Sequence, residues 1–453
     1  MIPGLSEKNL IKAFLAVSAV IFIAALLGKF IVFGSRPGNW VYPYISSFDL
    51  SRLAPFLIFI PLVWLGLRAT HASGEREERS VIIMWLILGL ACQYLVMGLR
   101  GPSLGQLVAD PVINSYYTVS RRFGFVELAR NYLQLAASGR LTLHAFGNMP
   151  GKVFFYQLLG AVTASPAAMG HIIVVISASA GILVYSVTKR LFGDRLTAAY
   201  AMILYLFIPA RTYFMPAMNT VTPVFPLVAL LLLLIYLQSK RRIFLWLLGA
   251  ACYLMFVFEP LPFVTGLIWA AVIVSYYREK RIGLKDIFYA VAIPLVSFLV
   301  LAGAAYLVFG INIPAAFDLI ISDMNNSHVN LSRGYSVWVF ENLRNFFFGA
   351  GIAQALVFFI YLAKAGWKKN FFRMENLFLL SFTAALLIMD LSGVIRAEAG
   401  RIWIFMMAFL QIAAARFCAS EKDRSFLYII VTAAILQTLI SAATVGFLLP
   451  FRV

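Results

Sequence analysis

The sequence is poor in charged residues and in cysteine. Only 12% of its 453 residues are Asp, Glu, Lys or Arg, against about 25% in a typical soluble domain, whereas 62% are hydrophobic. This composition excludes a water-soluble fold, and an aromatic content of 15% excludes intrinsic disorder, because such a chain buries apolar surface. Three cysteines without CxxC spacing exclude a disulfide scaffold. The composition therefore predicts an all-α, polytopic membrane protein.

Long apolar runs recur along the whole chain. A hydrocarbon core about 30 Å thick needs roughly 20 apolar residues per helix, and this length predicts about 13 transmembrane helices. A shorter run at 153–164 predicts a half-inserted or interfacial helix. The expected spans lie near 10–33, 53–69, 81–99, 168–188, 196–214, 220–238, 243–259, 262–277, 287–309, 346–364, 375–394, 402–417 and 425–448.

Carboxylates are scarce beside cations, with 19 Asp and Glu against 37 Lys and Arg. Most cations gather in alternate short loops, which the positive-inside rule places in the cytoplasm. We therefore expect a cytoplasmic N-terminus, an external C-terminus and no nucleic-acid partner, because the net charge of +18 is topological. The cationic loops lie near 68–79, 189–195, 240–242, 278–285, 364–373 and 416–424.

Acidic, basic and histidine residues that could bind a substrate or catalyse a reaction gather in the expected external segments 100–166, 310–345 and 394–401. The first segment begins with Asp110 before a proline and continues with an amphipathic run from Ser120 to Ser138, which predicts interfacial helices. His144 and then Pro150-Gly151-Lys152 follow. A proline and a cation at a helix start favour an anion site, because the first backbone N–H groups there are unpaired.

Each of these residues also has a structural interpretation. Asp110 is equally suited to a cap or turn before Pro111, and His144 to a hydrogen-bonded loop histidine. The spacing of Glu398 and Arg401 suits an i,i+3 ion pair. Trp40 and Trp338 are expected as anchors at the membrane interface, with sugar stacking as an alternative for Trp338. The two later segments hold His328, Arg333, Tyr335, Arg396, Glu398 and Arg401.

An acidic residue in the first external loop, followed by interfacial helices and a His144…Pro150-Gly151 turn that opens a short helix, resembles the GT-C class of membrane glycosyltransferases. The likeness is to its protein-mannosyltransferase-like branch, which depends on polyprenyl-phosphate sugars. The stretch 396–405 is similar to the Glu–Arg–Trp–Phe signature of this branch. The resemblance covers a catalytic core at about 81–410. It leaves helices 1–80 outside the shared core and 411–453 as a C-terminal transmembrane region.

The resemblance implies transfer of a sugar, with inversion, from a polyprenyl-phosphate donor to a glycan, lipid or protein acceptor at the external face. It makes Asp110 the general base. No cofactor is expected, and no HxxxH or DxD pair in these loops demands a divalent metal. The implied donor-phosphate ligands are Lys152, Arg333, Arg396 and Arg401, with Arg211 and Arg344 as second candidates. The implied substrate-pocket residues are His144, His328, Tyr335 and Glu398.

Three alternatives remain at this point. An O-antigen polymerase or ligase-type enzyme would use a lipid diphosphate and show external Arg at regular intervals. A lipid or sugar transporter or flippase would place ionisable groups near the bilayer midplane on broken helices. A structural scaffold would have no reason to gather Asp, His and Arg on one side. A structure in which Asp110 points away from any cavity would remove its role as general base.

Overall fold

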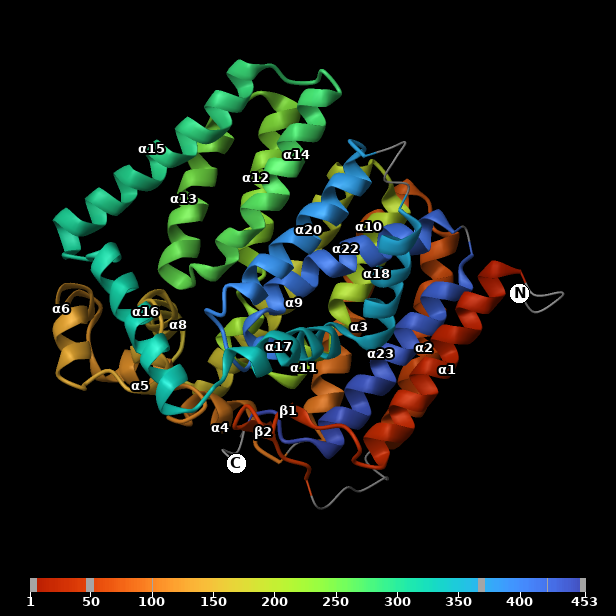
Figure 1. Cartoon of the computed structure of the whole chain (residues 1–453), viewed down its shortest axis with the longest axis horizontal. Helices are drawn as coiled ribbons and strands as arrows, with labels where there is room; N and C mark the ends of the chain where they lie inside the picture. Colours follow the sequence, from red (N-terminus) through yellow and green to blue (C-terminus); the bar gives the residue numbers. More distant parts are fainter. Residues whose placement is uncertain (1–5, 46–52, 100, 366–370, 422, 449–453) are drawn as a thin grey trace.

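The computed structural model describes residues 6–45, 53–99, 101–365, 371–421 and 423–448. Figure 1 shows a bundle of helices that run between two ends of the molecule, with short helices gathered at one end. The one sheet in the described residues is the antiparallel hairpin β1 (Phe33–Ser35) and β2 (Trp40–Tyr42). The prediction of a nearly all-α, multi-pass membrane protein is confirmed in this coarse form.

Nine helical stretches in the described residues are long and apolar enough to cross a membrane. Each coincides with one of the expected spans. Those made of one helix are α1 (Glu7–Leu27), α2 (Ala54–Ala72), α9 (Pro166–Phe192), α15 (Leu284–Phe309), α20 (Met374–Leu391) and α23 (Ser425–Thr444). Those extended by a 3-10 turn are η2–α3 (Glu75–Glu77 and Glu78–Met97), η3–α12 (Met218–Thr220 and Val224–Ser239) and η4–α14 (Leu261–Thr265 and Gly266–Arg278).

The expected count of about 13 is not confirmed. Two of the remaining candidates form shorter apolar helices, α13 (Ile243–Phe258) and α22 (Ile404–Ser420). The candidate at 196–214 divides into α10 (Arg195–Leu206) and the short α11 (Pro209–Tyr213). Almost every residue of α10 and α22 is buried, and these two helices pack against each other in the core.

The candidate span at 346–364 is broken. Helices α17 (Tyr335–Ala350) and α18 (Ile352–Lys364) meet at an angle of 109°. Between them Gly351 has a φ of 104°, a conformation that a residue with a Cβ rarely adopts. Such a break exposes backbone groups that apolar surroundings cannot satisfy.

Two glutamines from neighbouring helices bond the backbone at this break. Gln437 of α23 accepts from the Ile352 N–H at 2.9 Å and donates to the Phe348 carbonyl at 2.8 Å. Gln411 of α22 donates to the Ala350 carbonyl at 3.0 Å. Apolar runs predict helices but not a bend that distant side chains stabilise.

Replacing Gln437 by leucine leaves the Ile352 N–H without its partner. A buried, unsatisfied donor costs about 1–3 kcal/mol, so we expect Gln437→Leu to lower the free energy of unfolding by this amount. Thermal unfolding of the purified protein in micelles measures the change. The same substitution at exposed Gln134 is the control, and equal stability of the two variants would contradict the role of Gln437.

The short helices gather at the end of the bundle where the expected external segments lie (Figure 1). The expected amphipathic run from Ser120 to Ser138 is interrupted at Phe123 and Gly124, where two helices meet. The expected short helix at 153–164 is present as α8. The helices at this end are α4 (Leu104–Ala109), α5 (Ser115–Arg122), α6 (Phe125–Ala137), α7 (Leu143–Phe146), α8 (Gly151–Val162), α16 (Ile313–Asn330) and α21 (Ala399–Ile402).

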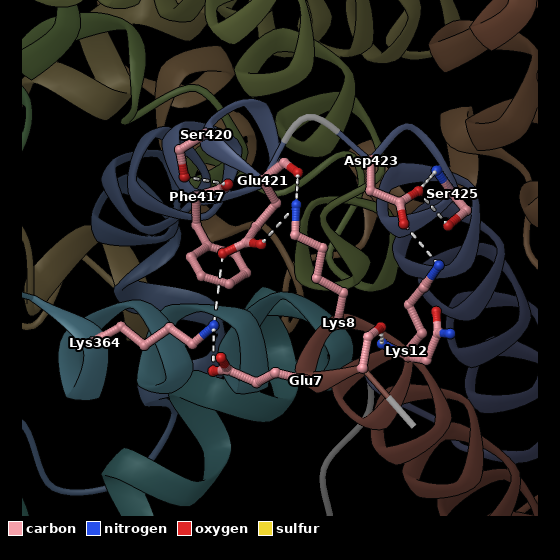
Figure 2. Close-up of polar contacts among 11 residues, drawn as sticks. Glu7, Lys8, Lys12, Lys364, Phe417, Ser420, Glu421, Asp423 and Ser425 are labelled. Atoms are coloured by element: carbon pink, nitrogen blue, oxygen red, sulfur yellow. Dashed lines mark hydrogen bonds and ion pairs between the residues drawn. The ribbon is translucent and has the colours of Figure 1, made fainter. Parts of the chain in front are cut away.

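At the opposite, cation-rich end, ion pairs connect α1 to α18 and to the α22–α23 connection (Figure 2). Lys12 lies 2.7 Å from Asp423, and Lys364 lies 2.9 Å from Glu7. Lys8 and Lys364 both approach Glu421, at 3.6 Å. The expected loop cations Lys368, Lys369 and Lys422 lie outside the described residues. These contacts hold the N-terminal helix, of which little is otherwise buried, against the bundle.

Candidate functional site

A cavity of about 770 Å³ opens among the short helices. Its walls come from the α4–α5 connection, the α7–α8 region, the turn after α13, α16 and the segment before α22. Seven of the nine expected site residues line it, although they come from segments far apart in sequence. These seven are His144, Lys152, His328, Arg333, Arg396, Glu398 and Arg401.

Asp110 does not line this cavity. It ends α4, and its Oδ1 accepts hydrogen bonds from the N–H groups of Val112 at 2.8 Å and Ile113 at 3.0 Å. This is the turn geometry that the sequence allowed for an aspartate before Pro111. The structure therefore brings the neighbouring Ile113 and Asn114 to the cavity, but not the expected general base.

Tyr335 also lies outside the cavity lining, and its hydroxyl donates to the Leu391 carbonyl at 2.9 Å. The second candidates for phosphate binding have other partners. Arg211 is buried in the bundle and donates to the carbonyls of Leu206 and Ser177. Arg344 pairs with Glu341 at 2.6 Å.

Lys152 forms a buried ion pair at the cavity wall. Its Nζ lies 3.0 Å from the Glu259 carboxylate and donates to Asn148 Oδ1 at 2.9 Å. Glu259 also accepts from the Thr222 hydroxyl at 2.8 Å. Burial lowers the pKa of Lys152, an effect that Glu259 opposes. The expected phosphate ligand Lys152 is thus already neutralised by a carboxylate.

Gly151 makes this pairing possible, because α8 starts directly against the end of α13. A Cβ at Gly151 would lie 2.4 Å from the Val257 carbonyl oxygen and 2.7 Å from Phe258 Cα. No side chain fits at that separation. The absence of a Cβ therefore lets Lys152 of one segment reach Glu259 of the other.

Breaking this pair from one side is expected to destabilise the protein. Glu259→Gln leaves the Lys152 ammonium, 1% exposed, without its counter-charge, which typically costs about 3–5 kcal/mol. The double variant Lys152→Met/Glu259→Gln removes both charges and should recover most of that loss. Denaturation in micelles measures all three proteins, with Glu279→Gln in the exposed Glu279–Arg281 pair as the control. A double variant less stable than Glu259→Gln would contradict this account.

Glu398 and Arg401 form the i,i+3 ion pair that their spacing allowed, and both side chains are largely buried. Ala397 and Glu398 have φ values of 86° and 62°, which only glycine adopts at low cost. Two successive left-handed residues at a cavity wall indicate backbone strain held by the surrounding structure. This turn directs the Glu398 carboxylate to Arg401.

Arg333 and Arg396 hold each other through backbone carbonyls. Arg333 Nη1 donates to the Arg396 carbonyl at 3.1 Å, and Arg396 Nη1 donates to the Arg333 carbonyl at 3.1 Å. Arg396 has no carboxylate partner among the described residues. Both guanidinium groups line the cavity and are held in place by these reciprocal bonds.

Two neutral histidines complete the polar wall. Burial, assisted by the charge of Arg401, lowers the pKa of His144 to about 4, and the ring stacks on Tyr116. Burial also lowers the pKa of His328, whose Nε2 lies 2.9 Å from the Val394 carbonyl. A carbonyl only accepts, so Nε2 of His328 carries the proton and Nδ1 is the free acceptor.

The lowered pKa of His144 makes stability depend on pH. Between pH 6.5, the usual pKa, and pH 4 the unfolded chain binds a proton at His144 that the folded chain does not. The contribution of His144 to the free energy of unfolding is therefore fully present above pH 6.5 and decreases as the pH falls toward 4. We expect His144→Gln to flatten the decrease in melting temperature over this range. His171→Gln, at an exposed histidine, should leave the decrease as in wild type.

Two cavity carboxylates were not predicted as site residues. The sequence offers one signal for Glu259, its position as a carboxylate between two apolar runs. Asp323 lies on α16 and lines the cavity, yet it makes no hydrogen bond or ion pair within the described residues. Burial raises its pKa. Nothing in its local sequence separates it from Asp318, which is exposed on the same helix.

The remainder of the cavity wall is largely apolar. No group of three or more His, Cys, Asp or Glu side chains in the described part of the chain is placed to hold a metal ion. The cavity thus joins a cationic wall, one unpaired carboxylate and an apolar wall, which suits an amphiphilic anion. The apolar wall includes Leu107, Phe256, Phe263, Phe317, Ile320 and Met324.

No family model matches the chain, and no curated protein matches it in a sequence search. The likeness to the GT-C class therefore depends on the motif residues of the sequence alone.

Proposed function

We propose that the protein is an integral-membrane glycosyltransferase that moves a sugar from a polyprenyl-phosphate donor to a hydroxyl-bearing acceptor. The observation that carries the proposal is the convergence of Arg333 and Arg396 with Asp323 on one half-apolar cavity. With a cytoplasmic N-terminus, as the loop charges predict, the cavity faces outward. The donor, the acceptor and this sidedness belong to the proposal.

The charges of the cavity suit this chemistry. Four cations and three carboxylates line it, and two of the cations are paired with carboxylates, Lys152 with Glu259 and Arg401 with Glu398. Arg333 and Arg396 also line the cavity, and their guanidinium groups would donate to a phosphate, because a guanidinium fork binds two oxygens at once. The two neutral histidines add hydrogen-bonding groups without charge.

The reaction is a single displacement. The acceptor oxygen attacks the anomeric carbon of the sugar while the bond from that carbon to the phosphate oxygen breaks. The acceptor proton passes to the Asp323 carboxylate, and the polyprenyl phosphate leaves with its charge against Arg333 and Arg396. Asp323 replaces Asp110 as our choice for the general base, because Asp110 does not line the cavity and the other two cavity carboxylates, Glu259 and Glu398, are in ion pairs.

Turnover of labelled polyprenyl-phosphate sugars by the protein in lipid nanodiscs tests the proposal. We expect Asp323→Asn to lower kcat about 10²–10⁴-fold, the range for loss of a general base. Asp318→Asn, at an exposed carboxylate of the same helix, and Asp110→Asn should retain turnover. Because burial raises the pKa of Asp323, kcat/KM should rise with pH at a midpoint above the usual pKa of an aspartate.

Other outcomes would contradict specific parts of the proposal. Loss of turnover in Asp110→Asn with normal turnover in Asp323→Asn would return the role of base to Asp110. If wild type turned over lipid-diphosphate sugars but no monophosphate donor, the enzyme would be of the polymerase or ligase type. Movement of the lipid across the bilayer without sugar transfer would indicate a transporter or flippase.

A further inference from the structure

The β1–β2 hairpin belongs to a segment that the sequence placed outside the catalytic core. Its register pairs Phe33 with Tyr42 and Ser35 with Trp40. Gly34, at a φ of 86°, lies so close to the opposite strand that a Cβ there would meet the Trp40 carbonyl oxygen at 2.1 Å. The hairpin lies at the same end of the molecule as α16 and α17 (Figure 1).

Side chains of α17 hold the first strand. Asn345 Oδ1 accepts from the Gly34 N–H at 3.3 Å. Arg344 donates to the carbonyls of Val32, at 3.0 Å, and Gly34. The expected interface anchor Trp338 is instead 1% exposed.

The turn and the residues after the second strand are held as well. At the turn, a Cβ on Gly38 would meet the Trp338 ring at 2.7 Å, so the backbone lies directly on the indole. Beyond the second strand, the Pro43 carbonyl accepts from the Gly446 N–H at 2.9 Å, and the Ile45 N–H donates to the Thr444 carbonyl at 2.8 Å. The hairpin is thereby fixed at both ends.

The fixed hairpin presents Trp40 to a cavity cation. The indole lies 4.7 Å from the guanidinium carbon of Arg333. Arg333 lines the cavity and also bonds the Arg396 carbonyl. Trp40 is not among the cavity-lining residues, so it contacts the guanidinium without contacting the space a ligand would occupy.

We infer that Trp40 is a positioning residue for anion binding, which acts by holding the plane of the Arg333 guanidinium toward the cavity. The identity of the anion, a lipid-linked phosphate, rests on the proposed function. An arginine side chain loses rotamer freedom when it binds an anion, and stacking on a fixed indole, together with the bond to the Arg396 carbonyl, restricts the rotamers of Arg333 beforehand. Residues 33–42 are then part of the functional site rather than an addition to it.

The test is binding of a polyprenyl phosphate without sugar to the full chain in nanodiscs, together with steady-state turnover. We expect Trp40→Leu to weaken binding and raise KM about tenfold with little change in kcat, whereas Trp40→Phe, which keeps a π face, recovers most of the affinity. In an Arg333→Gln background Trp40→Leu should add no further loss. Trp64→Leu, at an exposed tryptophan of α2, is the control.

The outcomes separate the inference from the proposed function. Equal binding by wild type and Trp40→Leu, or an equal loss from Trp40→Leu with and without Arg333, overturns the positioning role. A decrease in kcat and thermal stability with unchanged affinity overturns it too, because it indicates a structural role. Wild-type binding that depends on Trp40, without sugar transfer, supports the inference and contradicts the proposed glycosyl transfer. Absence of binding by wild type overturns both.

Discussion

Buried backbone and charged groups need hydrogen-bond or ion-pair partners. In a chain that is 62% hydrophobic, this requirement limits where ionisable side chains can lie. Within the bundle, the break between α17 and α18 exists because Gln437 and Gln411 bond the backbone groups it frees. At the end of the bundle, short helices and connections meet instead of long apolar faces. There ionisable side chains find partners, and a cavity forms between them.

The same need explains the charge pattern of the cavity. Lys152 and Arg401 each pair with a carboxylate in the cavity wall. Without these partners each buried charge would lower the free energy of unfolding. Arg333 and Arg396 each donate to the other's backbone carbonyl. Asp323 alone among the cavity carboxylates has no hydrogen bond or ion pair in the described residues. We therefore assign a structural role to the two ion pairs and the proposed role of base to Asp323.

Sequence patterns predicted which segments contribute to the cavity better than they predicted the role of each residue in it. The three expected external segments do meet at one end of the bundle, and seven of nine expected residues share the cavity. Asp110 failed to join them because an aspartate before a proline can satisfy its own turn, as it does with Val112 and Ile113. The sequence predicted Trp40 as an interface anchor but not its contact with Arg333, because the two residues lie almost three hundred positions apart.

The sequence by itself determined the class of the protein and the places where its polar chemistry lies, because hydrophobic length and loop charge are local properties of a chain. The spacing of Glu398 and Arg401 already predicted their ion pair, but tertiary structure alone decided which charges of distant segments neutralise each other. The pairing of Lys152 with Glu259 depends on Gly151 lying against α13, and the stacking of Trp40 on Arg333 depends on a hairpin held by α17 and the 444–446 segment. These are contacts between distant segments, and no local pattern encodes them.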